Sequence, residues 1–583
     1  MTIAPGAPAF PSPRIVDSRR LTGPNLYSVR PGAVLEVTCD VALAATLLDA
    51  WSTHAFAIVG ALGWGRAEVN TRRDADGATL FLAAPADVLM TATEVNEQAW
   101  TLAEQGRVAD RRAVITRLAA MANAERATQP NVVAVLGEAV SRGVLATFDD
   151  EVLTIGSGAG SLSWPLRDVP GPRDIAWSAV RDVSIALVTG SNGKTTTTRL
   201  VCAMWAASGI TPGWCCSDGV WAGAHMIEAG DFSGPAGARI VVRQTTIGAA
   251  VLETARGGML RRGLAVTRAD AAIITNLSAD HFGEYGVASV RDLAEVKGVV
   301  ARVLGARGQL VLNADDALLC ELAARVRANV SWFSTAPANA AVDAHVRAGG
   351  AAATVHEGRA MLHRDGAWHD LGDVNDMPLT LRGAAPHNIA NILGAALLAS
   401  VLGVPVQAIR AALATFGAAA DDNPGRLQVY PIGGVTVLID YAHNPDGLAA
   451  LCETAKALPS RRRLLLLGQA GNRDDEQIRA LARAAWGVTP FDRVIVKEER
   501  ALLRGRAPGE VPRLLVDELD RLGVRPDDVD VAPSELEALR LAFAWALEGD
   551  LLVCPIHIDK AEVRAWLDRL ATSGWRVGAP LPD

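Results

Sequence analysis

The sequence has few cysteines and no pairing pattern among them. Seven cysteines are scattered along 583 residues, and their spacing matches neither a zinc site nor a disulfide framework. We therefore predict a protein of a reducing compartment, the cytoplasm. Residues 1–14 show no charged segment followed by an apolar core, so we expect no signal peptide.

Excess positive charge and uninterrupted apolar runs are missing as well. The net charge of −8 does not favour binding to nucleic acid. The most hydrophobic long segment, residues 41–64, is interrupted by Asp49 and His54, so it predicts one or two buried helices rather than a membrane span. The composition is 50% hydrophobic and 21% charged, which is typical of a globular protein, and the length predicts several domains.

What the sequence does contain is a phosphate-binding loop. An apolar run breaks into Thr189-Gly-Ser-Asn-Gly-Lys-Thr-Thr196. Gly190 and Gly193 would let successive backbone N–H groups point at phosphate oxygens, while Lys194 supplies positive charge and Thr195 a hydroxyl for Mg²⁺. The alternative is a chance glycine turn between a strand and a helix. The glycines, the lysine, the threonine pair and the context agree, and they predict a nucleoside triphosphate site.

Strand patterns alternate with helix patterns around this loop and again nearer the C-terminus, which predicts an α/β protein with parallel sheets. Ligands in such sheets gather at the carboxyl ends of the strands. The predicted strands are 33–38, 78–83, 183–188, 249–253, 271–275, 309–313, 435–439, 463–467, 493–496 and 551–554, and the predicted helices include 41–51, 94–119, 197–207 and 289–304.

Three further residues lie where they could serve the loop. Glu253 directly follows a predicted strand, so its carboxylate can ligate Mg²⁺ beside Thr195. His281 follows the next strand, and Lys297 lies in the predicted helix 289–304. Each has a structural alternative: Glu253 could be an ion-pair partner at the strand end, His281 a turn residue and Lys297 a solvated helix lysine.

The order of these motifs resembles the Mur ligase superfamily. The matching residues are Thr189 to Thr196, Glu253, Asn276, Asp280-His281, Lys297, His387-Asn388, Asn391, Gly425-Arg426 and Asp440-Tyr-Ala-His-Asn-Pro445. Other strings look like the Mur-type half of the cyanophycin synthetase family. They are Cys216-Ser-Asp-Gly-Val220, Gly230-Asp-Phe-Ser-Gly-Pro235, Glu253-Thr-Ala-Arg-Gly-Gly-Met-Leu-Arg-Arg-Gly-Leu264 and Arg504-Gly-Arg-Ala-Pro-Gly-Glu510, and Leu21-Thr-Gly-Pro-Asn-Leu-Tyr-Ser28 resembles that family's N-terminal domain.

The resemblance implies a division into domains. Residues 1–165 would form a small α/β N-terminal domain, 166–180 a linker, 181–422 the central ATP-binding domain with its parallel sheet, and 423–583 a Rossmann-like C-terminal domain. The cyanophycin synthetase family carries an ATP-grasp module between its N-terminal and Mur-like parts. Only the short linker stands at that place here, so we expect one ATP site.

The resemblance also implies roles for residues in an ATP-dependent amide ligase that forms an acyl phosphate. Two Mg²⁺ ions are expected, the first on Thr195 and Glu253 and the second on His281 and a carbamylated Lys297. Arg426 would reach the γ-phosphate when the C-terminal domain closes. ATP would further be held by Gly190, Asn192, Gly193, Lys194, Thr196, Asn388, Asn391, Asp440 and His443, and the catalytic residues would be Lys194, Glu253, His281, Lys297 and Arg426.

The substrates implied are arginine or lysine as amine donor and an aspartyl side chain of a cyanophycin-like peptide as acceptor. A guanidinium would need carboxylates, for which Asp474, Asp475, Glu476, Glu498 and Glu499 are candidates, although acids at a helix start are ordinary. The family implies a homo-oligomer, and a separate synthetase would supply the acceptor. The alternatives are a non-catalytic accessory subunit of a full synthetase and a Mur ligase acting on another peptide.

Overall fold

The protein is described here by a computed structural model that covers residues 13–39, 41–74, 77–106, 110–279 and 282–582. Within these ranges the strands form four sheets of four, three, eleven and six strands. The fold is therefore mixed α/β, as predicted, and the two larger sheets are mostly parallel.

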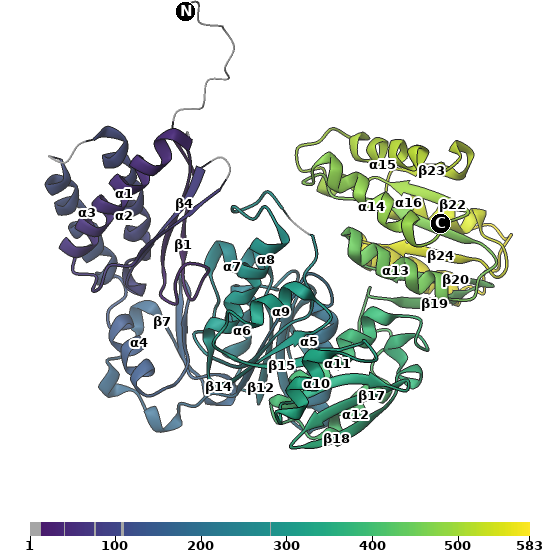
Figure 1. The fold of residues 1–583 in the computed structure, drawn as a ribbon, viewed down its shortest axis with the longest axis horizontal. Coiled ribbons are helices and arrows are strands. Elements are labelled where there is room, and N and C mark those ends of the chain that lie inside the picture. Colours follow the sequence, from purple (N-terminus) through teal and green to yellow (C-terminus); the bar gives the residue numbers. More distant parts are fainter. Residues whose placement is uncertain (1–12, 40, 75–76, 107–109, 280–281, 583) are drawn as a thin grey trace, which may run out of the picture.

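The N-terminal sheet is antiparallel and is covered by helices on one face (Figure 1). Trp51 and Trp100 are fully buried in this layer, and the Trp51 indole donates to Asn96 at 2.9 Å. The other face buries Leu21, Val34 and Phe81. The strands are β1 (Arg14–Leu21), β2 (Gly32–Thr38), β3 (Val69–Arg73) and β4 (Gly77–Ala83), in the order β1-β2-β4-β3, and the helices are α1 (Val41–Ala61), α2 (Leu89–Gln105) and α3 (Arg111–Ala127).

Helix α1 contains most of the apolar segment 41–64 and packs against α2. No helix in the described part of the chain is both long and apolar enough to cross a membrane. A small antiparallel sheet follows, made of β5 (Ala146–Phe148), β6 (Val152–Ile155) and β7 (Leu162–Pro165) and packed against α4 (Val132–Ser141). Residues 166–180 then contain only short 3-10 turns.

Strand β8 (Ser184–Thr189), which precedes the predicted phosphate-binding loop, lies near the middle of the central sheet between two parallel neighbours. Alternate residues of β8 point to opposite faces, so Val188 enters one hydrophobic cluster and Leu187 the other. The remaining strands, in the order β11-β10-β9-β12-β8-β13-β14-β15-β16-β17-β18, are β9 (Pro212–Cys216), β10 (Gly219–Ala222), β11 (His225–Ala229), β12 (Ala249–Glu253), β13 (Ala269–Ile274), β14 (Leu304–Asn313), β15 (Asn329–Ser334), β16 (Ala352–His356), β17 (Arg359–Arg364) and β18 (Ala367–Asp373).

Helices cover both faces of the central sheet, and one of them differs from its prediction. The helix predicted over 289–304 is α8 (Val290–Lys297), with a Ser289–Asp292 capping box, followed by a 3-10 segment, Gly298–Val303. Glycine and two valines have low helix propensity, which accounts for the break. The other helices are α5 (Lys194–Ala207), α6 (Pro235–Val242), α7 (Arg256–Arg262), α9 (Ala317–Ala323), α10 (Ala340–Arg347), α11 (Pro386–Val401) and α12 (Val406–Thr415).

The C-terminal sheet is parallel except for its edge strand β19, and helices lie on both sides of it. Its strands, in the order β19-β20-β24-β21-β22-β23, are β19 (Gln428–Ile432), β20 (Val435–Asp440), β21 (Arg463–Leu467), β22 (Arg493–Lys497), β23 (Val529–Ala532) and β24 (Leu551–Pro555). Its helices are α13 (Pro445–Ala457), α14 (Asp475–Val488), α15 (Glu510–Arg521), α16 (Glu535–Trp545) and α17 (Lys560–Thr572).

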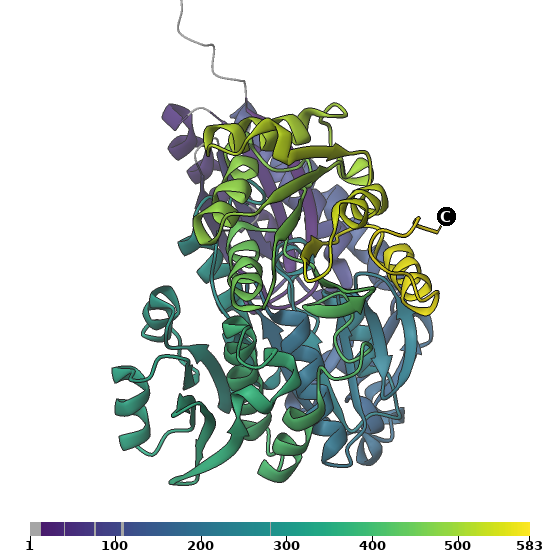
Figure 2. The same ribbon diagram turned by 90° about the vertical axis from the view of Figure 1, so that its right-hand side faces the viewer.

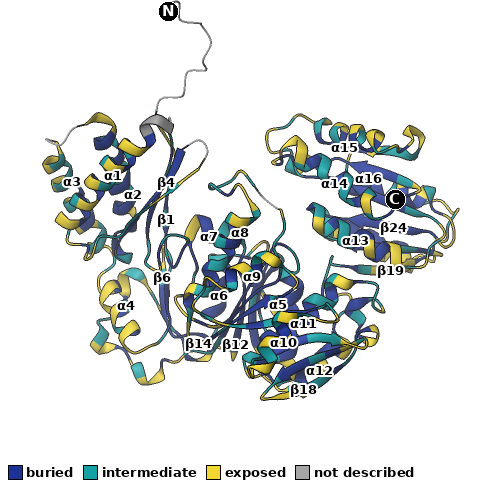
Figure 3. Cartoon of the chain, in the orientation of Figure 1, coloured by how far each residue is buried: buried dark blue, intermediate teal, exposed yellow. Residues whose placement is uncertain are grey.

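The N-terminal and C-terminal elements stand on the same side of the central sheet. Figure 1 shows them at its two ends, and Figure 2 shows the C-terminal elements in front of the N-terminal ones. The strands of the two larger sheets are mostly dark blue in Figure 3, whereas α3 and α4 show long exposed faces. Residues of all three groups of elements line a cleft beside the loop that follows β8.

Candidate functional site

The loop after β8 has the backbone that its sequence predicts. Gly190 and Gly193 have φ angles of 149° and 82°, which favour glycine. A Cβ atom at Gly190 would lie 1.8 Å from Thr275 Oγ1, and one at Gly193 would lie 2.2 Å from Asn391 Oδ1. A side chain at either position would collide with these neighbours. Helix α5 begins directly after the loop, at Lys194, so the N-terminus of this helix faces the loop.

Neighbouring strand ends fix the loop in place. The backbone N–H of Asn192 donates to Asn276 Oδ1 at 2.9 Å, and Thr275 Oγ1 donates to the Asn192 carbonyl at 2.6 Å. Lys194 Nζ donates to the Ser191 carbonyl at 2.9 Å, so its ammonium lies over the loop. The loop is thus held by residues that follow β13, and a cation lies beside it.

Thr195 and Glu253 meet at the start of α5, as predicted from the sequence. Thr195 Oγ1 donates to Glu253 Oε2 at 2.8 Å and lies 3.2 Å from Ser217 Oγ. Glu253 is only 2% exposed, and burial raises its pKa, although Lys194 and Arg426 act against the rise. A buried carboxylate beside a hydroxyl is an oxygen donor set that suits Mg²⁺, so these two residues fit the ion.

Lys297 also reaches the loop, from the last turn of α8. Its side chain is buried, and Nζ donates to the Gly190 carbonyl at 2.7 Å. The plain alternative, a solvated helix lysine, is wrong. His281, predicted as a ligand of a second ion, lies outside the described residues, so the second ion and the carbamylation of Lys297 stay predictions.

Arg426 is brought to the same place from the start of the C-terminal part. Its Nη2 donates to Ser217 Oγ at 2.7 Å, and its guanidinium lies 5.3 Å from the ring centre of Tyr441. Burial alone would lower the pKa of Arg426, but Asp218 and Glu253 raise it. The arginine is therefore a permanent cation next to the Thr195–Glu253 pair.

Asn388 and Asn391 lie in the first turns of α11 and support the loop from behind. Asn391 packs on Gly193 and donates to Asn388 Oδ1 at 3.0 Å, and Asn388 donates to the Leu379 carbonyl at 2.9 Å. Both side chains are buried. Their predicted contact with the base or ribose stays a prediction.

Asp440 and His443 lie in the loop after β20. Asp440 accepts the N–H groups of Ala442 and Leu427, each at 2.8 Å, so it shapes this loop. His443 Nδ1 lies 3.2 Å from the Tyr441 carbonyl. The predicted contacts of both residues with the nucleotide are not tested by this geometry.

Three contacts between the central and C-terminal parts were missed by the sequence reasoning. Asn444 and Asn192 exchange two amide hydrogen bonds, of 3.0 and 3.3 Å. Asn423 donates to Thr196 Oγ1 at 3.1 Å. Lys560 Nζ lies 3.6 Å from Asp218 and 4.1 Å from the Tyr441 ring centre. Asn192, Thr196 and Asn444 stand in quoted motifs, whereas no quoted motif contains Asn423 or Lys560.

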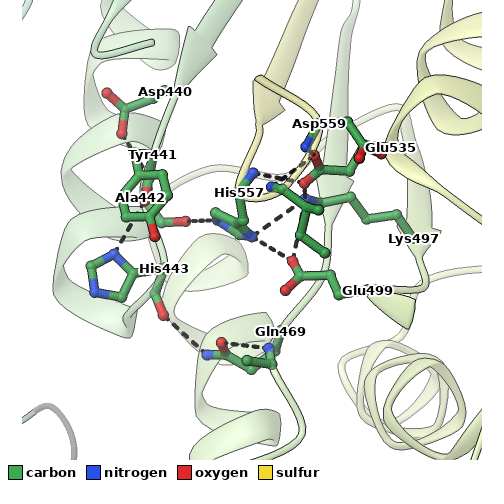
Figure 4. A network of polar contacts seen from close by, with 12 residues as sticks. Asp440, Tyr441, Ala442, His443, Gln469, Lys497, Glu499, Glu535, His557 and Asp559 are labelled. Atoms are coloured by element: carbon green, nitrogen blue, oxygen red, sulfur yellow. Dashed lines mark hydrogen bonds and ion pairs between the residues drawn. The ribbon is translucent and has the colours of Figure 1, made fainter. Parts of the chain in front are cut away.

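A buried charge network supports the loop after β20 (Figure 4). Lys497 Nζ lies among Glu499, Glu535 and His557, and it forms ion pairs with both carboxylates. His557 Nε2 lies 2.9 Å from the Ala442 carbonyl, while Nδ1 contacts Glu499. Burial alone would raise the pKa of Glu499, but His557 and Lys497 hold it at about 2.

These contacts correct the expectation that Glu499 is available to a guanidinium. Glu499, Glu535 and His557 lie close enough together to hold a metal ion, but the Lys497 ammonium already lies among them. The other candidate acids also have partners inside the C-terminal part. Glu498 accepts the Gly509 N–H, Asp474 caps α14, Asp475 pairs with Arg506, and Glu476 pairs with Arg483.

All three groups of elements line one cleft of about 1560 Å³. The loop contributes Gly190, Ser191 and Lys194. The N-terminal strand β1 contributes Asp17 to Arg20, and the C-terminal part contributes Tyr441, His443, Gln469, Arg473, Glu499 and His557. A substrate in this cleft can contact the phosphate loop and both flanking parts at once.

Comparison with known protein families identifies the class. Residues 188–399 match the Mur ligase middle domain, and residues 425–555 match the Mur ligase glutamate ligase domain. Together the two matches cover more than half of the chain, which belongs to the Mur ligase family.

Comparison with individual proteins adds detail to the family assignment. The chain is 38% identical over 371 residues to a cyanophycin synthetase of Crocosphaera subtropica, and 39% identical over 382 residues to one of a Synechocystis strain. These alignments cover 64% and 65% of the chain but 42% and 43% of the relatives, so it matches less than half of their length. A UDP-N-acetylmuramoyl-L-alanyl-D-glutamate–2,6-diaminopimelate ligase of Chlorobaculum tepidum is 29% identical, over 63% of the chain and 70% of that protein.

Proposed function

We propose that the protein is an ATP-dependent carboxylate–amine ligase that forms ADP and phosphate. The observation that supports this most is the meeting of Lys194, Thr195 and Glu253 with Arg426, which comes from a separate part of the chain. A carboxylate must approach the negatively charged γ-phosphate in such a reaction. Cations placed in advance around the phosphates lower the cost of that approach.

The proposed reaction has two steps. A carboxylate oxygen of the acceptor attacks the γ-phosphorus, the bond to the ADP oxygen breaks, and an acyl phosphate forms. The amine nitrogen then attacks the acyl carbon, phosphate leaves, and the amine loses a proton. Lys194 and Arg426 would hold the phosphate oxygens in the first step, and Mg²⁺ on Thr195 and Glu253 would neutralise phosphate charge.

The finer substrate assignment follows the relatives. We propose that arginine or lysine is joined to an aspartyl side chain of a cyanophycin-like peptide, supplied by a separate synthetase. A second Mg²⁺ would be held by His281 and a carbamylated Lys297. Closure of the C-terminal part over the loop would exclude water, which otherwise hydrolyses the acyl phosphate.

A turnover screen tests the function directly. The full chain is incubated with Mg-ATP, aspartyl peptides and a panel of amines, and ADP and coupled products are read by enzymatic assay and mass spectrometry. We expect ADP only when both carboxylate and amine are present, with an amide product of matching mass. ADP formation that is independent of every acceptor and amine would refute the proposal.

A further inference from the structure

One buried arginine in the cleft has no carboxylate partner among the described residues. Arg239, in α6, is 7% exposed and donates from Nη2 to Thr22 Oγ1 at 2.5 Å, while its buried Nε has no partner there. Burial lowers its pKa to about 10, because the nearby charges do not compensate for lost hydration. A buried guanidinium that has no carboxylate partner would be stabilised by an anion that binds in the cleft.

More arginines surround Arg239 on the same wall. Arg261 and Arg262 are exposed at the end of α7, and Arg262 is tied to the N-terminal part because its carbonyl accepts the Thr22 N–H at 2.8 Å. Arg20 comes from β1 and pairs with Asp150, which is 71% exposed. Its Nη1 and Nη2 donate to the two Asp150 oxygens at 3.0 and 3.2 Å, so Arg20 adds to this wall a positive charge that Asp150 partly neutralises.

The acids of the wall do not balance these charges. Ten arginines and lysines line the cleft but only five aspartates and glutamates. Asp17 and Glu36 are both engaged by Arg19, Glu284 pairs with Arg256, and Asp231 accepts two hydrogen bonds from Ser233. Among the described residues Arg239, Arg261 and Arg262 form no ion pair, so this wall is electropositive in a chain whose net charge is −8.

We propose that the wall formed by Arg239, Arg261, Arg262 and Arg20 is an anion subsite that binds carboxylates of an acidic acceptor peptide other than the carboxylate being activated. The inference rests on the proposed function, since it presumes that a carboxylate is presented to the loop. The loop and the arginine wall line one cleft, so a peptide with several carboxylates can occupy both. The N-terminal part would thereby take part in selecting the acceptor, through Arg20 and Thr22.

A binding experiment without ATP tests the subsite separately from turnover. Fluorescently labelled peptides with one to five aspartates are titrated onto the full chain, and anisotropy gives the affinity. We expect affinity to rise with each added carboxylate and to fall with salt. Arg239→Gln should weaken binding of the five-aspartate peptide about tenfold, as expected for loss of a charge-assisted hydrogen bond.

Matched variants keep the result interpretable. Arg262→Gln changes an exposed side chain, so it should fold normally and weaken the same peptide about threefold. Arg239→Lys should recover part of the loss caused by Arg239→Gln. Arg525→Gln removes an exposed arginine that pairs with Asp528 on the C-terminal part, and it should leave the affinity unchanged.

Two outcomes would overturn the subsite. One is equal affinity of the five-aspartate peptide for the wild type, Arg262→Gln and Arg525→Gln. The other is displacement by inorganic phosphate with no dependence on peptide length, which would indicate a general anion site. Failure of the proposed function looks different, because peptide binding would then depend on the arginines while no peptide and amine together yield ADP.

Discussion

Replacement of Glu253 by glutamine separates two effects that a buried carboxylate has on this protein. Glutamine keeps the shape and can still accept the 2.8 Å hydrogen bond from Thr195, but it removes the charge. Because the lost negative charge would no longer hold Mg²⁺, we expect Mg²⁺-dependent ADP formation to fall about tenfold to a hundredfold, which corresponds to about 1.4–2.8 kcal/mol. The concentration of Mg²⁺ needed for half-maximal rate should rise as well.

The metal-free protein should respond in the opposite direction. The pKa of Glu253 is higher in the folded protein than in the unfolded chain, because the carboxyl is buried. Ionisation of Glu253 therefore destabilises the fold at pH values above the folded-state pKa. This destabilisation disappears as the pH falls below the pKa of the unfolded chain. Without Mg²⁺ at neutral pH, Glu253→Gln should therefore melt at the same temperature as the wild type or higher. On acidification through this window, the wild type should gain stability relative to the variant.

The assay combines thermal melts in EDTA at several pH values with Mg²⁺ titrations of ADP release. Glu228→Gln is the control, because Glu228 is exposed on the edge strand β11. The reasoning is refuted if Glu253→Gln leaves the Mg²⁺ requirement unchanged, or if it lowers the melting temperature of the metal-free protein.

Three further changes probe the supports of the site. Asn444→Ala removes both side-chain hydrogen bonds to Asn192, so KM for ATP should rise about fivefold while the melting temperature stays within a few degrees. An unchanged KM would contradict the role given to this contact. Lys497→Met leaves two buried carboxylates without their shared cation, and chemical denaturation should show a loss of about 3–5 kcal/mol; a stable variant would show that the ion pairs are dispensable. If Lys297 is carbamylated, removal of dissolved CO₂ should lower ADP release and bicarbonate should restore it, whereas the same rate with and without bicarbonate would speak against carbamylation.

Local patterns were sufficient for most of the fold around the loop. Apolar runs predicted β8, β12, β13, β20 and β24 because buried parallel strands are short and continuously apolar. The glycines of the loop follow from backbone conformation, which depends only on neighbouring residues. The predicted helix 289–304 extends past Lys297, where α8 ends. The helical sequence pattern continues beyond Gly298, although the backbone there tightens into a 3-10 segment.

What the sequence by itself determined is the glycine loop after β8, which it predicts to bind phosphate, and the chemistry of the residues that follow each strand. Only the tertiary structure decided which distant side chains meet them, because contacts such as Asn192–Asn444 and Arg239–Thr22 join positions more than two hundred residues apart and leave no local pattern. The same is true of Glu499, which looks like a free acid in the sequence but is held by Lys497 and His557 in the fold. Charge along the chain does not reveal charge in a cleft, so the electropositive wall around Arg239 could be found only in three dimensions.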